Sequence, residues 1–313
     1  MPRSALLLAC LLAAQPVAGA GADPGHDNAK GPGLEPAADV RAAPAPPSGR
    51  RVLRDLAYGS SPLQSIDVYL PPGATAAPLV VMVHGGAWRF GDKATSRVVD
   101  NKVARWLPRG IGLVSVNYRL LPEAGLTLQA GDVAAALAFV QRHAGEWGAN
   151  PREILLMGHS AGGHLVALLG ADPGRVTAAG GLPWRGTVVL DSAALDVEAL
   201  MARRHYRLHD RAFGKDPAQW AALSPRAQVS PGATPMLLVC STKRPDHPCD
   251  DARDMATTLA AQGTPVQLQP EARSHSELNA GLGQDSDYTR AVEAFMAGVS
   301  PAWRERLAPP ATR

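Results

Sequence analysis

The chain has 313 residues, 46% of them hydrophobic, and a formal net charge of +3. This length and hydrophobic content suit one globular domain of the larger kind. The charge is mild, and the sequence contains no block of Lys and Arg that would neutralise a row of phosphates. We therefore expect no nucleic-acid partner, while the composition leaves the oligomeric state open.

The amino terminus has the pattern of an export signal. Arg3 supplies a basic start, residues 4–14 are almost wholly apolar, and residues 18–20 read Ala-Gly-Ala, an A-x-A cleavage site. The pattern predicts a signal peptide over 1–20, a periplasmic or secreted protein, and no stable membrane span after cleavage. An uncleaved anchor and a lipidated Cys10 are the alternatives, and the apolar run is short for either.

The remainder divides into a linker and a catalytic domain. Residues 21–49 are rich in Pro, Gly and Ala and carry almost no large apolar side chains, so we expect a flexible linker. Residues 50–313 alternate apolar strands with helical stretches. The eight strand candidates are Val52–Tyr58, Ser65–Leu70, Leu79–His84, Gly112–Asn117, Ile154–Met157, Thr187–Leu190, Met236–Cys240 and Val266–Gln269.

The strand and helix patterns together predict the fold class. The later strands are continuous aliphatic runs, as expected of parallel strands buried on both faces. The clearest helix spans 132–146, where Val133, Leu137 and Val140 share one face and Asp132 is a candidate cap. We expect an α/β fold with a doubly wound, mostly parallel eight-stranded sheet, whose catalytic groups gather at the carboxyl ends of the strands.

A nucleophile motif follows the fifth predicted strand. Residues 158–162 read Gly-His-Ser-Ala-Gly between an apolar strand and an apolar helix. The turn from strand to helix is so sharp that small residues must flank the serine, whose Oγ then stands above the sheet at the helix amino terminus. This context predicts that Ser160 is a catalytic nucleophile.

A second loop supplies candidate oxyanion donors. Residues 84–88 read His-Gly-Gly-Ala-Trp directly after a strand, where this type of fold builds its oxyanion hole. Glycines allow backbone N–H groups to approach a developing alkoxide. We predict that the donors are the amides of Gly86, Ala87 and Ala161.

These motifs resemble a known family over residues 52–297. The His-Gly-Gly-Ala-Trp and Gly-His-Ser-Ala-Gly-Gly-His segments, Asn117-Tyr118-Arg119 and the late His275 are similar to the hormone-sensitive-lipase and feruloyl-esterase-like (BD-FAE-type) branch of the α/β-hydrolases, which is related to kynurenine formamidases. The resemblance implies an α/β-hydrolase fold and hydrolysis of a carboxylic ester, without a metal or organic cofactor.

The general base is predicted from position. The triad in this fold runs Ser, acid, His along the chain. His275 lies just past the last predicted strand, where the base belongs, whereas His205, His209 and His247 fall in polar segments. We therefore expect His275 to be the base.

The acid departs from the family pattern. Relatives place an Asp a few residues beyond the penultimate strand, but here that position holds Lys243 or Arg244. Asp246 is the nearest carboxylate and is our prediction, while Asp250 and Asp251, which suit the first turn of the next helix, and a residue elsewhere are the alternatives.

Two cysteines enclose this segment. Removal of the signal leaves Cys240 and Cys249, an even pair that predicts a disulfide in an exported protein. Two free thiols are the alternative. A bridge here would hold the loop that contains Asp246.

The long connection 194–234 is predicted to form a small helical lid, with helical pieces around 196–204 and 217–223. Four aromatic residues are candidates for a substrate wall, and ordinary packing is the alternative for each: Trp88, Tyr206, Phe213 and Trp220. We interpret Arg119 as a structural residue that pairs with a carboxylate or carbonyl group.

The leading hypothesis is an exported serine carboxylesterase that acts on small-molecule esters of short-chain or aryl, feruloyl-like type. A kynurenine-formamidase-like arylformamidase is the second hypothesis. A noncatalytic binding module with the same fold is a third, which only the displaced acid supports.

Overall fold

The computed structural model describes residues 49–308. The predicted signal peptide, Cys10 and all but the last residue of the predicted linker lie outside the described residues. Every helix within 49–308 is too short or too polar to cross a bilayer.

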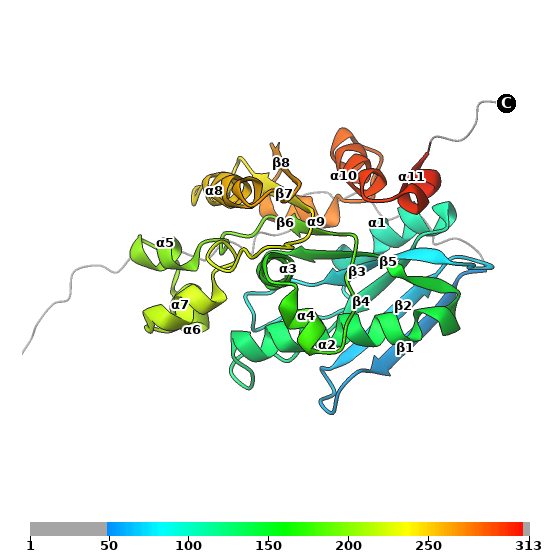
Figure 1. Cartoon of the computed structure of the whole chain (residues 1–313), viewed down its shortest axis with the longest axis horizontal. Helices are drawn as coiled ribbons and strands as arrows, with labels where there is room; N and C mark the ends of the chain where they lie inside the picture. The colour runs from blue at the N-terminus through cyan, green and yellow to red at the C-terminus, as the bar shows by residue number, and fades with distance from the viewer. Residues whose placement is uncertain (1–48, 309–313) are drawn as a thin grey trace, which may run out of the picture. The chain divides into compact units, whose positions relative to one another are not determined.

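One mixed sheet contains all eight predicted strands (Figure 1). The first two strands of the spatial order β1-β2-β4-β3-β5-β6-β7-β8 pair antiparallel with their neighbours, and the other strands run parallel. The predicted fold class is therefore confirmed. The strands are β1 (Arg51–Ala57), β2 (Ser65–Leu70), β3 (Ala77–Val83), β4 (Gly112–Val116), β5 (Ala149–His159), β6 (Gly186–Leu190), β7 (Met236–Ser241) and β8 (Val266–Glu271).

Helices cover both faces of the sheet, with α2 and α4 on one side and α1, α10 and α11 on the other in Figure 1. The apolar cluster under the first face includes residues of α2 (Leu126–His143), α3 (Ala161–Ala171), α4 (Gly174–Ala178) and α8 (Pro248–Ala261). The cluster under the second face includes residues of α1 (Ser96–Trp106), α9 (His275–Ala280), α10 (Asp287–Gly298) and α11 (Pro301–Leu307). Two short 3-10 helices, Leu107–Arg109 and Ala144–Trp147, complete these layers.

The central strand β3 shows why its sequence is continuously apolar. Val81 and Val83 belong to the cluster under the first face, whereas Val80 and Met82 belong to the cluster under the second. All four side chains are fully buried. A strand covered on both faces has no solvated side, so the alternation of apolar and polar residues disappears.

The predicted helix at 132–146 is longer at its start than the sequence indicates. Helix α2 begins at Leu126, so Asp132 lies inside the helix and does not cap it. Its carboxylate accepts hydrogen bonds from Nε of Arg119 at 2.8 Å and Nη2 at 2.6 Å. Arg119 therefore pairs with a carboxylate, as expected of a structural residue.

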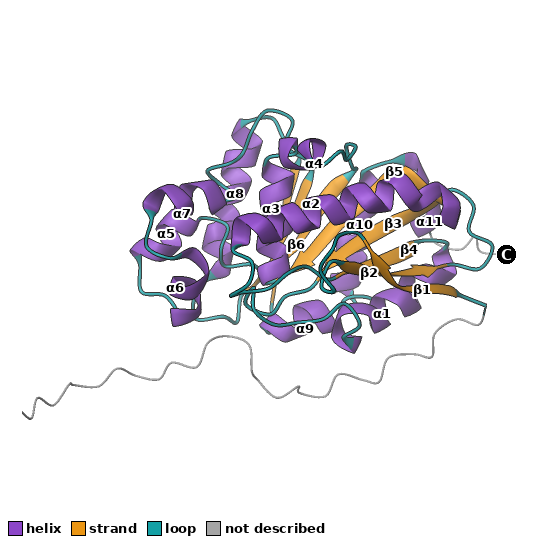
Figure 2. Ribbon diagram, turned by 90° about the horizontal axis from the view of Figure 1, so that it is seen from below, coloured by secondary structure: helices purple, strands orange, loops and turns teal. Residues whose placement is uncertain are grey.

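The connection between β6 and β7 forms three short helices, α5 (Val197–Ala202), α6 (Arg207–Phe213) and α7 (Pro217–Leu223). Figure 2 shows them grouped together. Helices α5 and α7 match the predicted helical pieces, and the side chains of Asp196 and Asp216 cap their amino termini. Helix α6 is additional.

Candidate active site

The nucleophile elbow joins β5 directly to α3. Ser160 stands between them with φ of 56°, a left-handed value that costs energy for a residue with a side chain. A Cβ added to Gly158 would lie 2.3 Å from the carbonyl oxygen of Gly162, and one added to Gly162 would lie 2.3 Å from that of Val83. Both glycines are therefore required by close backbone contacts around the serine.

The loop after β3 lies against the nucleophile. A Cβ added to Gly85 would come within 2.9 Å of the Ser160 Cβ. Gly86, Ala87 and Trp88 all have positive φ, at 126°, 52° and 58°. Within residues 49–308, no hydrogen bond uses the N–H of Gly86, Ala87 or Ala161. These three amides are thus available as donors beside Ser160.

His275 is the first residue of α9, and a capping box formed by Ser274 and Glu277 fixes the start of that helix. The Nδ1 of His275 lies 2.6 Å from Oδ2 of Asp191. The elbow residue His159 places its Nε2 2.9 Å from the carbonyl oxygen of His275, and the two imidazole rings lie 4.5 Å apart. Because Nδ1 donates to the carboxylate, Nε2 of His275 is the nitrogen left to exchange protons.

Asp191 directly follows β6 and is completely buried. Its φ is 53°, so each of the neighbouring strands β5 and β6 is followed by a left-handed residue with a polar side chain. Its Oδ1 accepts the N–H of Ser241 at 2.8 Å. Burial by itself raises the pKa of Asp191, but the hydrogen bond from His275 and the charge of Arg244 outweigh it and hold the pKa well below its usual range.

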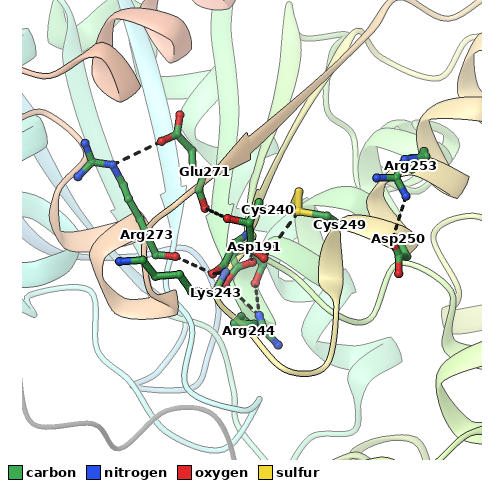
Figure 3. The surroundings of a disulfide bond; sticks show 11 residues. Asp191, Cys240, Lys243, Arg244, Cys249, Asp250, Arg253, Glu271 and Arg273 are labelled. Carbon is green, nitrogen blue, oxygen red and sulfur yellow. Dashed lines mark hydrogen bonds and ion pairs between the residues drawn. A yellow bond between two sulfur atoms is a disulfide. The ribbon is translucent and has the colours of Figure 1, made fainter.

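The structure does not place the predicted acid, Asp246, against the predicted base. The Asp246 carboxylate accepts a hydrogen bond from Nε of Arg244 at 2.9 Å, and Arg244, not Asp246, lies beside His275. The alternatives are also engaged elsewhere, since Asp250 pairs with Arg253 and Asp251 with Arg203. Figure 3 shows Asp250 directed away from Asp191.

A sequence signal for Asp191 exists. The strand Thr187–Leu190 is predicted correctly, and Asp191 follows it as Ser160 follows the neighbouring strand. A carboxylate at that edge belongs to the site on topological grounds. The family pattern instead directs attention to the next strand, whose following loop here contains a guanidinium.

The predicted disulfide is present. Cys240, near the end of β7, is bonded to Cys249 in the first turn of α8, with an S–S distance of 2.06 Å (Figure 3). The loop between them carries Arg244 and Asp246.

Two of the four candidate wall residues are buried against each other. The rings of Trp88 and Phe213 lie 5.1 Å apart and both side chains are almost inaccessible. Trp88 Nε1 donates to Nδ1 of His164 at 3.2 Å, and Trp220 Nε1 donates to the carbonyl oxygen of Phe213 at 3.1 Å. Tyr206 is half-buried. These contacts join α6 and α7 to the oxyanion loop, and a substrate wall remains a prediction.

A serine elbow, an adjoining loop of free amides and a His–Asp pair at the carboxyl edge of a doubly wound sheet define the α/β-hydrolase fold. A truncated carbohydrate esterase from gut microbiota has the same fold, with a TM-score of 0.71 and 20% identity over 83% of this chain and 99% of that one. Esterase B from Lactobacillus rhamnosis aligns with a TM-score of 0.66 and 19% identity over 84% of this chain and 89% of that one.

Sequence comparison narrows the class. Residues 66–179 match the BD-FAE family. The probable isoprenylcysteine alpha-carbonyl methylesterase ICME of Oryza sativa subsp. japonica is 35% identical over 119 residues, which are 38% of this chain and 28% of that protein. Esterase LipQ of Mycobacterium tuberculosis is 27% identical over 245 residues, 74% of this chain and 55% of that protein. The chain thus has the α/β-hydrolase fold and a segment similar to the BD-FAE family, and it spans about a quarter of the length of the methylesterases it matches.

Proposed function

We propose that the protein is a serine carboxylesterase with Ser160 as nucleophile, His275 as base and Asp191 as acid. The hydrogen bond of 2.6 Å between His275 Nδ1 and Asp191 carries the proposal, because it orients the ring and leaves Nε2 free. The order of the residues along the chain also supports the proposal, since Ser160 is followed by Asp191 and then by His275.

The reaction follows from this arrangement. Nε2 of His275 takes the Ser160 proton while Oγ attacks the acyl carbon, and the amides of Gly86, Ala87 and Ala161 stabilise the oxyanion. The protonated ring then gives its proton to the leaving alkoxide, and an acyl-serine forms. In the second half-reaction, His275 takes a proton from water, which attacks the acyl-serine. The carboxylic acid is released, and Ser160 regains its proton from His275. Each oxyanion donor contributes about 3 to 4 kcal/mol to the transition state.

We also propose that the substrates are short-chain or aryl esters and that the protein is exported to the periplasm or the exterior. The similar proteins include a probable isoprenylcysteine alpha-carbonyl methylesterase and a carbohydrate esterase, and these names support an ester as the substrate. The A-x-A site at 18–20 and the Cys240–Cys249 bridge support folding outside a reducing compartment.

Labelling and turnover test the proposal together. Wild-type protein should react with a fluorophosphonate probe at Ser160 and hydrolyse p-nitrophenyl acetate and methyl ferulate. Ser160→Ala should abolish both activities, whereas Ser60→Ala, which changes an exposed serine, should retain them. Turnover of N-formylkynurenine alone would replace the esterase by an arylformamidase. Absence of labelling in folded wild-type protein would favour a binding module.

For export, the full chain is produced with a carboxyl-terminal tag in a bacterial host, and the fractions are compared. Recovery outside the cytoplasm with an amino terminus near Gly21 is expected. An intact amino terminus in the cytoplasmic fraction would contradict export.

A further inference from the structure

Arg244 stands where the family pattern places the acid. It lies in the loop between β7 and α8, inside the ring closed by Cys240 and Cys249. Only 7% of its side chain is exposed. A buried guanidinium keeps its charge, so its neighbours must compensate for lost hydration.

Its contacts lead directly to the proposed triad. Nη1 of Arg244 donates to Oδ2 of Asp191 at 3.0 Å and to the Asp191 carbonyl oxygen at 3.2 Å. The same Nη1 lies 3.1 Å from Nδ1 of His275. Because Nη1 and the protonated Nδ1 are both donors, they do not bond to each other, and the Oδ2 atom is their shared acceptor.

The other side of the guanidinium faces Asp246. Nε of Arg244 donates to Oδ1 of Asp246, and Nη2 donates to Oδ2, so the pair is bidentate. The planar fork is thereby fixed in orientation. Two carboxylates flank one guanidinium, and the attraction of both holds the pKa of Arg244 above its ordinary value although burial opposes this.

We propose that Arg244 is a positioning residue for hydrolysis: it fixes the Asp191 carboxylate so that Oδ2 meets Nδ1 of His275, and Asp246 fixes Arg244 in turn. The inference rests on the proposed esterase function. Asp246 thus acts on the Asp191 carboxylate through Arg244 and does not contact His275 itself.

The contacts also argue against a substrate-binding role for Arg244. Each guanidinium nitrogen already donates to Asp191 or Asp246, and only 7% of the side chain is exposed, so neither edge of the fork is free for a bidentate ligand. A substrate carboxylate bound bidentately would have to displace one of these buried partners, which are held by charge-assisted hydrogen bonds. Loss of a positioning residue should lower kcat and leave KM unchanged, whereas loss of a binding residue should raise KM and leave kcat unchanged.

Steady-state kinetics separate the two roles. Arg244→Met should lower kcat about 10- to 100-fold, as expected when a catalytic group shifts by about 1 Å, with KM within about twofold of wild type. Arg244→Lys, which keeps the charge but not the fork, should recover part of the loss. Arg253→Met is the matched control, because Arg253 is exposed on α8 and pairs with Asp250. A raised KM at constant kcat, or no change at all, would overturn the proposal.

A proton NMR measurement gives a readout that does not depend on turnover. The hydrogen-bonded Nδ1–H of His275 should give a low-field resonance in wild type, and it should shift or broaden in Arg244→Met while remaining unchanged in Arg253→Met. If wild-type protein neither hydrolyses esters nor reacts with the probe, the proposed function fails, and this resonance still decides whether Arg244 orders the Asp191–His275 pair.

Folding is monitored by thermal melting. If Arg244→Met does not fold, Asp246→Asn is the second variant, since it loosens the fork and leaves the guanidinium in place. It should lower kcat about two- to fivefold, the size expected for loss of about 0.5 to 1 kcal/mol of hydrogen bonding, and shift the same resonance. Unchanged kcat and an unchanged resonance in Asp246→Asn would contradict the proposal.

Discussion

Helix α9 is held in different ways at its two ends. Its first residue, His275, is fixed at the carboxyl edge of the sheet by Asp191 and by Nε2 of His159. Its last turn is fixed by α1, where Nζ of Lys102 donates to the carbonyl oxygen of Asn279 at 2.8 Å and to its Oδ1 at 3.0 Å. The first end is held by a buried carboxylate that pairs with Arg244, the second by a cation that meets only neutral oxygens.

This difference determines how each end of α9 responds to pH. Around Asp191, a buried anion has a cationic partner in Arg244, so both groups stay charged over the ordinary pH range. Lys102 is completely buried, and burial lowers its pKa to about 7. Asp191 and Arg244 therefore keep their charges at neutral pH, whereas the opposite end of the same helix is anchored by a titrating group.

The largest expected effect comes from breaking the first end at Asp191. Asp191→Asn should lower kcat by about 10³- to 10⁴-fold, because the amide cannot hold the imidazole in the required tautomer. Asp250→Asn, which changes an exposed carboxylate paired on α8, should leave kcat unchanged. Saturation kinetics on p-nitrophenyl acetate measure both. Full activity of Asp191→Asn in folded protein would remove Asp191 from the triad.

The second end is tested through stability. Between a folded pKa of about 7 and the ordinary 10.5 for Lys102, the unfolded chain binds more protons, so the free energy of unfolding should rise with pH. The rise between pH 7 and pH 9 should be about 2 to 3 kcal/mol at most, measured by urea unfolding.

Lys102→Met should flatten this dependence, since no proton is then released on folding at that position. Arg97→Met at the exposed start of α1 serves as the control and should keep the wild-type slope. An equal slope in Lys102→Met and wild type would show that Lys102 remains charged in the folded protein.

The smallest effect is expected at His159. His159→Phe keeps a ring beside His275 but removes the hydrogen bond to its carbonyl oxygen, worth about 1 kcal/mol. We expect kcat to fall about fivefold, with little change in KM. His143→Phe on α2, remote from the elbow in sequence, is the control and should behave as wild type. A loss as large as that in Asp191→Asn would mean that His159 does more than orient α9.

The parts of the fold that sequence predicts are those encoded by neighbouring residues. Eight strands, the elbow and the oxyanion loop each depend on a short run of apolar or small residues, whose spacing is visible directly. The disulfide was also predictable, because only two cysteines follow the predicted signal peptide.

The remaining features depend on contacts between distant segments. Asp191 and His275 are 84 residues apart, and Lys102 and Asn279 are 177 apart. In the sequence, Lys102 looks like a solvated side chain on an amphipathic helix. Asp246 is compatible both with a catalytic role and with an ion pair to Arg244. The pairing of β6 with β7 brings Asp191 beside the loop that carries Arg244, and Arg244 thereby lies next to His275.

The bond between Cys240 and Cys249 also affects how this site is assembled. It closes a ring across a separation of nine residues, and such a ring removes conformations from the unfolded chain that are worth about 2 to 3 kcal/mol. Arg244 and Asp246 both lie within this ring. If the thiols oxidise before the sheet forms, the orientation of the catalytic base becomes linked to the redox state of the compartment in which the chain folds.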